Sequence, residues 1–78
     1  MRTLYIGGLP PETDHSALRR LLARFSGMVR ARVITLPSGV CKGFGYVTFK
    51  TAEDAEVALS ALDGSPYGEH HLRVAPAV

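Results

Sequence analysis

The sequence predicts an α+β fold in which two strand-helix-strand units share one four-stranded antiparallel sheet, with both helices on one face. Three observations predict it. Stretches with apolar residues at alternate positions suit strands, and two stretches with apolar residues at i, i+3, i+4 and i+7 suit helices. These stretches follow one another as strand, helix, strand, twice over. The chain has 78 residues, and we expect residues 1–78 to form one domain.

The first unit begins with a strand at residues 3–7, in which an apolar side alternates with a mixed side. A loop with two adjacent prolines follows it. Either Thr13 or Asp14 can cap the next helix, which we expect to end at Ser26-Gly27. The apolar stripe of this helix is Leu18, Leu21, Leu22 and Phe25.

The two middle strands are expected at residues 28–35 and 43–49, joined through a turn at residues 36–39. In the first of them, Ala31 and Val33 face the core. In the second, alternation places Gly45, Val47 and Phe49 on one side and Phe44, Tyr46 and Thr48 on the other.

The second helix is capped by Thr51 and closes at Asp63-Gly64. Its stripe is Ala55, Ala58, Leu59 and Leu62. A last strand at residues 71–75 turns Leu72 and Val74 inward. Because both helices have one apolar stripe, they can cover the same side of the sheet and leave the other side open, which is the ferredoxin-like split βαβ arrangement.

Composition and charge exclude several classes of protein. One cysteine cannot form a disulfide within the chain, and no apolar run is long enough to span a membrane. The net charge is +2, with a pI near 9.0. No acid falls on an expected strand, whereas the open side and its edges carry basic residues: Arg2, Arg30, Arg32, Lys42 and Arg73.

Three aromatic residues fall on the side of the sheet that should be wet. Tyr5, Phe44 and Tyr46 occupy alternate, outward positions of two strands that are neighbours in this topology. Exposed rings are costly to hydrate, so a partner is expected to cover them. Nucleobases suit this surface because each has a flat π-face that stacks on an aromatic ring.

These residues resemble the RNA-recognition motif family. Residues 42–49, KGFGYVTF, match that family's octamer with Tyr46 in place of phenylalanine. Residues 4–9, LYIGGL, are similar to its hexamer, although Gly8 stands where asparagine is common. The resemblance implies that Tyr5 and Tyr46 each stack a base, that Phe44 packs against sugars or between nucleotides, and that Lys42 contacts a phosphate.

The expected partner is therefore single-stranded RNA, with single-stranded DNA left open, and we expect no enzyme activity, cofactor, membrane or small-molecule substrate. A protein-interaction module on the same fold is the alternative, with the sheet or the arginines of the first helix as its surface. An acylphosphatase-like enzyme is a third reading, but no nucleophile-base pair or phosphate-binding glycine loop supports it. Glycines 43 and 45 lack the third glycine of a dinucleotide fingerprint.

Two smaller features have ordinary interpretations. His70-His71 is not expected to bind metal, because neighbouring strand residues point to opposite sides and no carboxylate or cysteine cluster accompanies them. Cys41 is expected in a loop, with a reactive thiol beside Lys42 as the alternative. A single domain that starts at Met1 and contains more arginine than lysine suggests a monomeric, cytoplasmic, bacterial protein, or else a fragment of a nuclear one.

Overall fold

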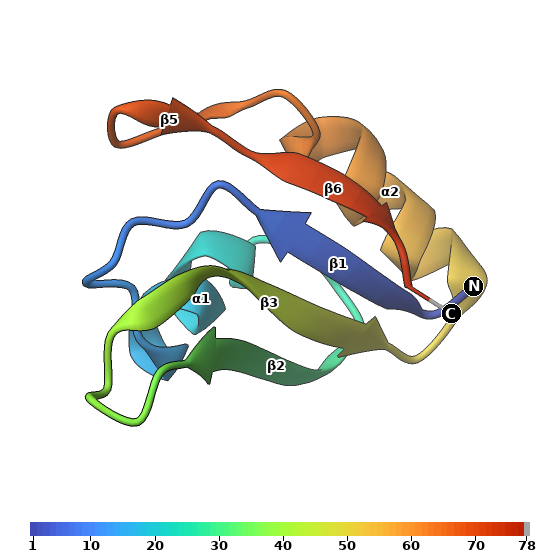
Figure 1. Ribbon diagram of the computed structural model, residues 1–78. Coiled ribbons are helices and arrows are strands. Elements are labelled where there is room, and N and C mark those ends of the chain that lie inside the picture. The colour runs from blue at the N-terminus through green and yellow to red at the C-terminus, as the bar shows by residue number, and fades with distance from the viewer. Residues whose placement is uncertain (78) are drawn as a thin grey trace.

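The computed structural model describes residues 1–77 and confirms the predicted architecture (Figure 1). One sheet of four antiparallel strands has the order β2-β3-β1-β6, and both helices lie behind it. The elements are β1 (Thr3–Gly7), α1 (His15–Leu22), β2 (Met28–Thr35), β3 (Cys41–Phe49), α2 (Ala52–Leu62), β4 (Pro66–Tyr67), β5 (His70–His71) and β6 (Arg73–Pro76).

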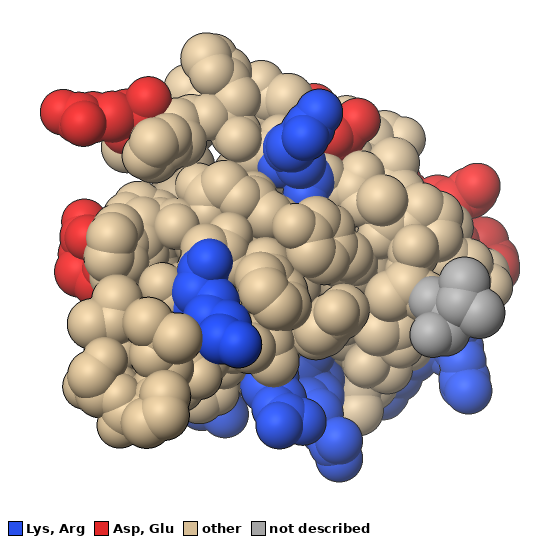
Figure 2. Space-filling model, viewed as in Figure 1, with Lys and Arg blue, Asp and Glu red and all other residues tan. Residues whose placement is uncertain are grey.

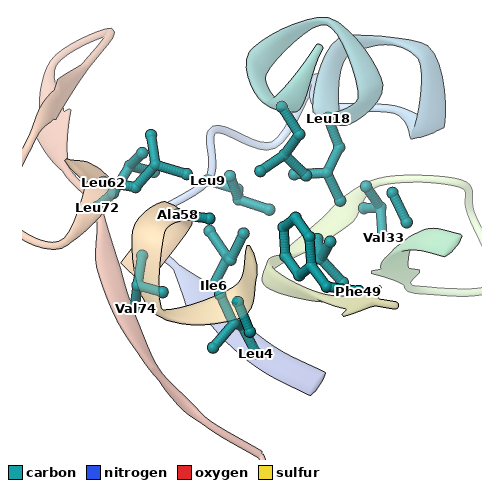
Figure 3. Packing of buried hydrophobic residues seen from close by; sticks show 14 of the residues in the cluster. Leu4, Ile6, Leu9, Leu18, Val33, Phe49, Ala58, Leu62, Leu72 and Val74 are labelled. Atoms are coloured by element: carbon teal, nitrogen blue, oxygen red, sulfur yellow. The ribbon is translucent and has the colours of Figure 1, made fainter. Parts of the chain in front are cut away.

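The core lies between the sheet and the two helices (Figure 3). Leu4 and Ile6 of β1 and Phe49 of β3 are buried against Leu18 of α1 and Leu62 of α2. Removing this apolar surface from water contributes about 25 cal/mol per Å². Because the helices fill one side of the sheet, the apolar core lies on that side, and no helix covers the opposite face.

Helix α1 ends at Leu22, so its predicted end at Ser26-Gly27 was too late. Beyond Leu22 the chain forms a tighter turn, in which the Phe25 amide donates to the Leu22 carbonyl at 3.0 Å. This turn still brings Phe25 against the core. The helical spacing of apolar residues thus continues to Phe25, beyond the last helical residue. This spacing is why the sequence predicted a longer helix. Asp14 is the N-cap, and its carboxylate accepts from the Ala17 amide at 2.8 Å.

The C-terminal third contains a small hairpin that the sequence did not predict. Strands β4 and β5 pair Pro66 with His71 and Tyr67 with His70, and Gly68 takes a positive φ of 63° in the turn. The last strand of the main sheet consequently starts at Arg73, not at residue 71. Leu72 and Val74 are nevertheless buried, as expected.

Cys41 is the first residue of β3 and is buried, so its expected place in a loop was wrong. Its amide donates to the Pro11 carbonyl at 2.9 Å, and its sulfur accepts from the Gly43 amide at 3.3 Å. The thiol therefore belongs to the core. Its burial argues against the alternative of a reactive thiol, which needs an accessible sulfur.

No helix in residues 1–77 is long and apolar enough to cross a membrane.

Candidate nucleic-acid interface

The open face is built from rows of side chains that run across the strands. Strand register places Tyr5 directly opposite Tyr46, which in turn lies opposite Arg32 of the edge strand β2. A second row, beside the first, runs from Arg73 of β6 across Gly7 of β1 to Phe44 of β3. Residues two apart on a strand share a face, so these rows lie side by side. The sheet pairing therefore gathers rings in the centre of the face and arginines at its two edges.

The three rings form one continuous cluster. The ring centroids of Tyr5 and Phe44 are 5.6 Å apart with an interplanar angle of 29°, a stacked arrangement. Tyr46 stands edge-on to both, with centroids 6.1 Å from Tyr5 and 5.9 Å from Phe44. Such mutual contacts hold aromatic side chains in defined orientations. Tyr46 is 37% exposed and the other two rings are half-buried, so the cluster presents apolar surface to solvent.

Gly7 lies beneath the Tyr5 ring and gives it room. A Cβ atom at Gly7 would stand 2.6 Å from the Tyr5 hydroxyl oxygen and 3.0 Å from the Cε1 and Cζ atoms of that ring. The missing side chain therefore lets the ring lie down along the strand toward Phe44. Gly7 was not among the predicted site residues, although its period-two spacing from Tyr5 could have identified it.

Two threonines extend the face on the other side of the rings. Thr3 and Thr48 lie opposite each other, and their hydroxyl oxygens are 3.1 Å apart in a hydrogen bond. Arg30 of β2 completes this row by pairing with Thr48. Both hydroxyls are hydrogen-bonding groups beside the aromatic cluster, and strand alternation could also have marked them as site residues.

The basic residues expected near the face are placed unevenly. Arg32 and Arg73 are exposed on the two edge strands in the rows that hold the rings, and Arg30 is exposed on β2 in the neighbouring threonine row. Lys42 is exposed on β3, two residues before Phe44. Arg2 is exposed just before β1 and lies outside these rows, because strand alternation gives Thr3 and Tyr5 the open face.

Figure 2 views the open face and shows blue Lys and Arg side chains over it and along the lower rim beside β2, while the red acids lie around the periphery. No acidic residue occupies a strand among residues 1–77. The described chain also holds no group of three His, Cys, Asp or Glu side chains that could bind a metal ion.

Gly8 shows why this chain departs from the hexamer pattern at that position. Its φ is +83°, and a Cβ there would collide with the main-chain carbonyl oxygen of His71. The loop after β1 is thus packed closely against the end of the β4–β5 hairpin, and asparagine would not fit without moving backbone.

Comparisons with known proteins agree with this geometry. Residues 4–73 match the RNA recognition motif family. The chain is 41% identical over 75 residues to the mitochondrial glycine-rich RNA-binding protein 2 of Arabidopsis thaliana, covering 95% of this chain and 48% of that protein. It is 31% identical over 75 residues to the human boule-like protein, covering 96% of this chain and 26% of that protein.

Among solved structures, the second RRM domain of the yeast poly(U)-binding protein superposes with a TM-score of 0.91 at 25% identity, covering 100% of this chain and 95% of that one. The chain thus spans about a quarter to a half of the length of these curated relatives. They come from an animal and a plant, so the comparisons give no support to the expected bacterial origin. Sequence match, sheet order and ring cluster together show that the chain belongs to the RNA recognition motif family.

Proposed function

We propose that residues 1–78 act as one non-catalytic domain that binds single-stranded RNA on the open face of the sheet. The observation that carries the proposal is the cluster of three mutually touching rings on a face that no described segment covers. Tyr5 and Tyr46 each stack a base, and Phe44, which touches both rings, packs against sugars or between nucleotides. A relative named as an RNA-binding protein supports the same ligand.

The phosphates of the bound strand are neutralised by cations placed around the rings. Arg32 lies next to Tyr46 across the strands, and Lys42 precedes Phe44 on the same strand. Arg73 serves the opposite edge and Arg30 the neighbouring row, while Arg2 is the least favourably placed of the five. Binding by such cations is sequence-independent and salt-sensitive.

We further propose that the domain works as a monomer in a reducing compartment such as the cytoplasm. The support is Cys41, the one cysteine of the chain, which is buried as a free thiol.

Replacing Tyr46 with alanine tests the proposal. Losing one stacked base is expected to weaken binding of a randomised five-nucleotide RNA by about 1–3 kcal/mol, which is about five-fold to more than a hundred-fold in Kd. Tyr46→Phe keeps the ring and is the matched control, expected to bind within about two-fold of the parent. Fluorescence polarisation gives the Kd of all three proteins for this RNA, and circular dichroism verifies that each variant is folded. Single-stranded DNA of the same length is tested as a second ligand.

The proposal would be wrong if Tyr46→Ala folded normally and bound RNA as tightly as the parent protein. NMR titration adds a second readout, because RNA should shift the amides around Tyr5 and Tyr46. Shifts confined to the exposed side of α2, around Val57, would instead indicate a protein-docking surface behind the sheet.

A further inference from the structure

The charges of this chain are divided between two segments. Residues 15–52 contain seven Lys or Arg residues and no Asp or Glu, whereas the other 40 residues contain all seven acids and only Arg2 and Arg73 as bases. Solubility alone does not require such a division, because interspersed charges of both signs keep a protein equally soluble. The division therefore suggests a charged ligand.

The fold turns this division along the chain into two sides of the molecule. The basic segment supplies α1, β2 and β3, with β2 at the edge of the sheet. The acidic remainder supplies nearly all of α2, which packs behind β3, β1 and β6, together with the β4–β5 hairpin. In Figure 2 several blue side chains gather along the lower rim beside β2, while others lie over the open face and in its upper part. On the open face a polyanion meets Arg30 and Arg32 at the β2 edge and only Arg73 on β6, so its attraction toward the β2 edge is the stronger.

Helix α1 carries this basic surface behind the sheet. The helix packs on β2 with Leu18 and Leu22 buried, and both Arg19 and Arg20 are exposed. The two arginines are about 100° apart around the helix axis and so lie on different flanks.

Arg20 occupies the flank that faces the hairpin. It lines a shallow hollow together with Tyr67 of β4 and the acidic residues Glu12 and Asp14. Arg19, one residue after buried Leu18, does not line this hollow, and the helix that carries it packs on β2, where Arg30 and Arg32 are exposed. Of these two arginines we therefore infer that Arg19 is the one that continues the positive surface of β2.

We propose that an RNA strand longer than the part held by the rings leaves the open face over the β2 edge and places a phosphate against Arg19 of α1. The inference rests on the proposed function and adds the direction in which the strand continues. The rings lie on the open face, whereas α1 lies behind the sheet, so nucleotides stacked on the rings are separated from Arg19 by the sheet (Figure 1). The contact at Arg19 consequently requires a longer strand.

The test compares randomised single-stranded RNAs of five and twelve nucleotides with the parent protein, Arg19→Gln and Arg20→Gln. Each substitution removes one charge from an exposed position of the same helix, so Arg20→Gln is a matched control. Arg19→Gln is expected to weaken binding of the twelve-nucleotide RNA about three- to ten-fold and to leave the five-nucleotide RNA unchanged. The slope of log K against log salt for the longer RNA should become shallower by about 0.7, the value for one phosphate contact on a single strand.

Arg20→Gln should change either affinity by less than about two-fold. Equal effects of the two substitutions on the longer RNA would overturn the proposal, because only net charge would then matter. So would an unchanged affinity of Arg19→Gln for the twelve-nucleotide RNA. If the parent protein bound neither RNA, the proposed function itself would fail, whereas normal binding of the short RNA with no effect at Arg19 refutes only the extended path.

Discussion

At the scale of single residues, the orientation of Tyr5 depends on an absent side chain. The ring of Tyr5 stacks on Phe44 and occupies the space that a side chain at Gly7 would fill. Gly7 has no positive φ, so its backbone does not itself require glycine. Its role is to leave room for a ring on the same face, two residues earlier in the strand.

Gly7→Ala is therefore expected to fold but to displace the Tyr5 ring. The new methyl group would meet the outer end of the ring, which can rotate away, so the cost falls on the ring position more than on stability. We expect RNA binding to weaken about three- to ten-fold, measured by fluorescence polarisation with the five-nucleotide RNA.

A double-mutant cycle separates this effect from general damage to the sheet. In a Tyr5→Ala background the ring is absent, and Gly7→Ala should then have no further effect on affinity. Fully additive losses in the double mutant would contradict a role through Tyr5, and so would unchanged NMR shifts of the Tyr5 ring in the single Gly7→Ala variant.

At the scale of elements, one side chain forms a hydrogen bond between the end of helix α2 and the edge strand β6 that packs against it. Asp63 is the C-cap of α2, and its carboxylate accepts from the Val74 amide at 3.1 Å. Val74 pairs with Ile6 of β1 on its other side. The hydrogen bond thus satisfies a donor on the free edge of the sheet and fixes where the helix end meets the strand.

Asp63→Ala should lower the free energy of unfolding by about 1–2 kcal/mol, because the partly buried Val74 amide loses its acceptor. Urea denaturation measures this change. Asp63→Asn keeps an acceptor oxygen and is expected to retain most of the stability. The short RNA should bind both variants with unchanged affinity, because Asp63 is not on the open face. A variant with alanine that is as stable as the parent would show that water replaces the carboxylate at no cost.

The elements also show where sequence patterns stop being informative. Strand β1 and the capping of α2 by Thr51 follow from local alternation and a single hydroxyl, and both were predicted. The end of α1 was not predicted correctly, because Phe25 keeps the helical spacing although the backbone has already left the helix at that point. The β4–β5 hairpin has only two residues in each strand, too few to show a period of two.

At the scale of the whole molecule, the open face is an electrostatic as well as an aromatic surface. Most of the bases lie on and beside the β2 edge, with Arg73 on β6, and the acids lie before α1, on or just after α2 and in the turn of the hairpin. An RNA that covers the rings meets Lys42 and the arginines of both sheet edges without meeting an acid on any strand.

Binding of the five-nucleotide RNA should consequently depend on salt. Three or four phosphate contacts predict a slope of log K against log salt of about −2 to −3 for a single strand. The measurement is fluorescence polarisation at salt concentrations from about 50 to 300 mM, the range over which such contacts weaken. A slope near zero would mean that stacking alone holds the RNA and that the edge arginines are only solvated.

The sequence by itself determined the order of elements, the side of each strand that is buried and the three rings left on the other side, because these follow from periods of two and 3.6 residues that act locally. Only the tertiary structure decided which outward residues stand opposite one another, as Arg32 does to Tyr46, and which flank of α1 faces the β2 edge. Register and helix rotation depend on packing between segments distant in the sequence, such as the fit of Leu18 beneath the sheet, and a local pattern does not contain that information.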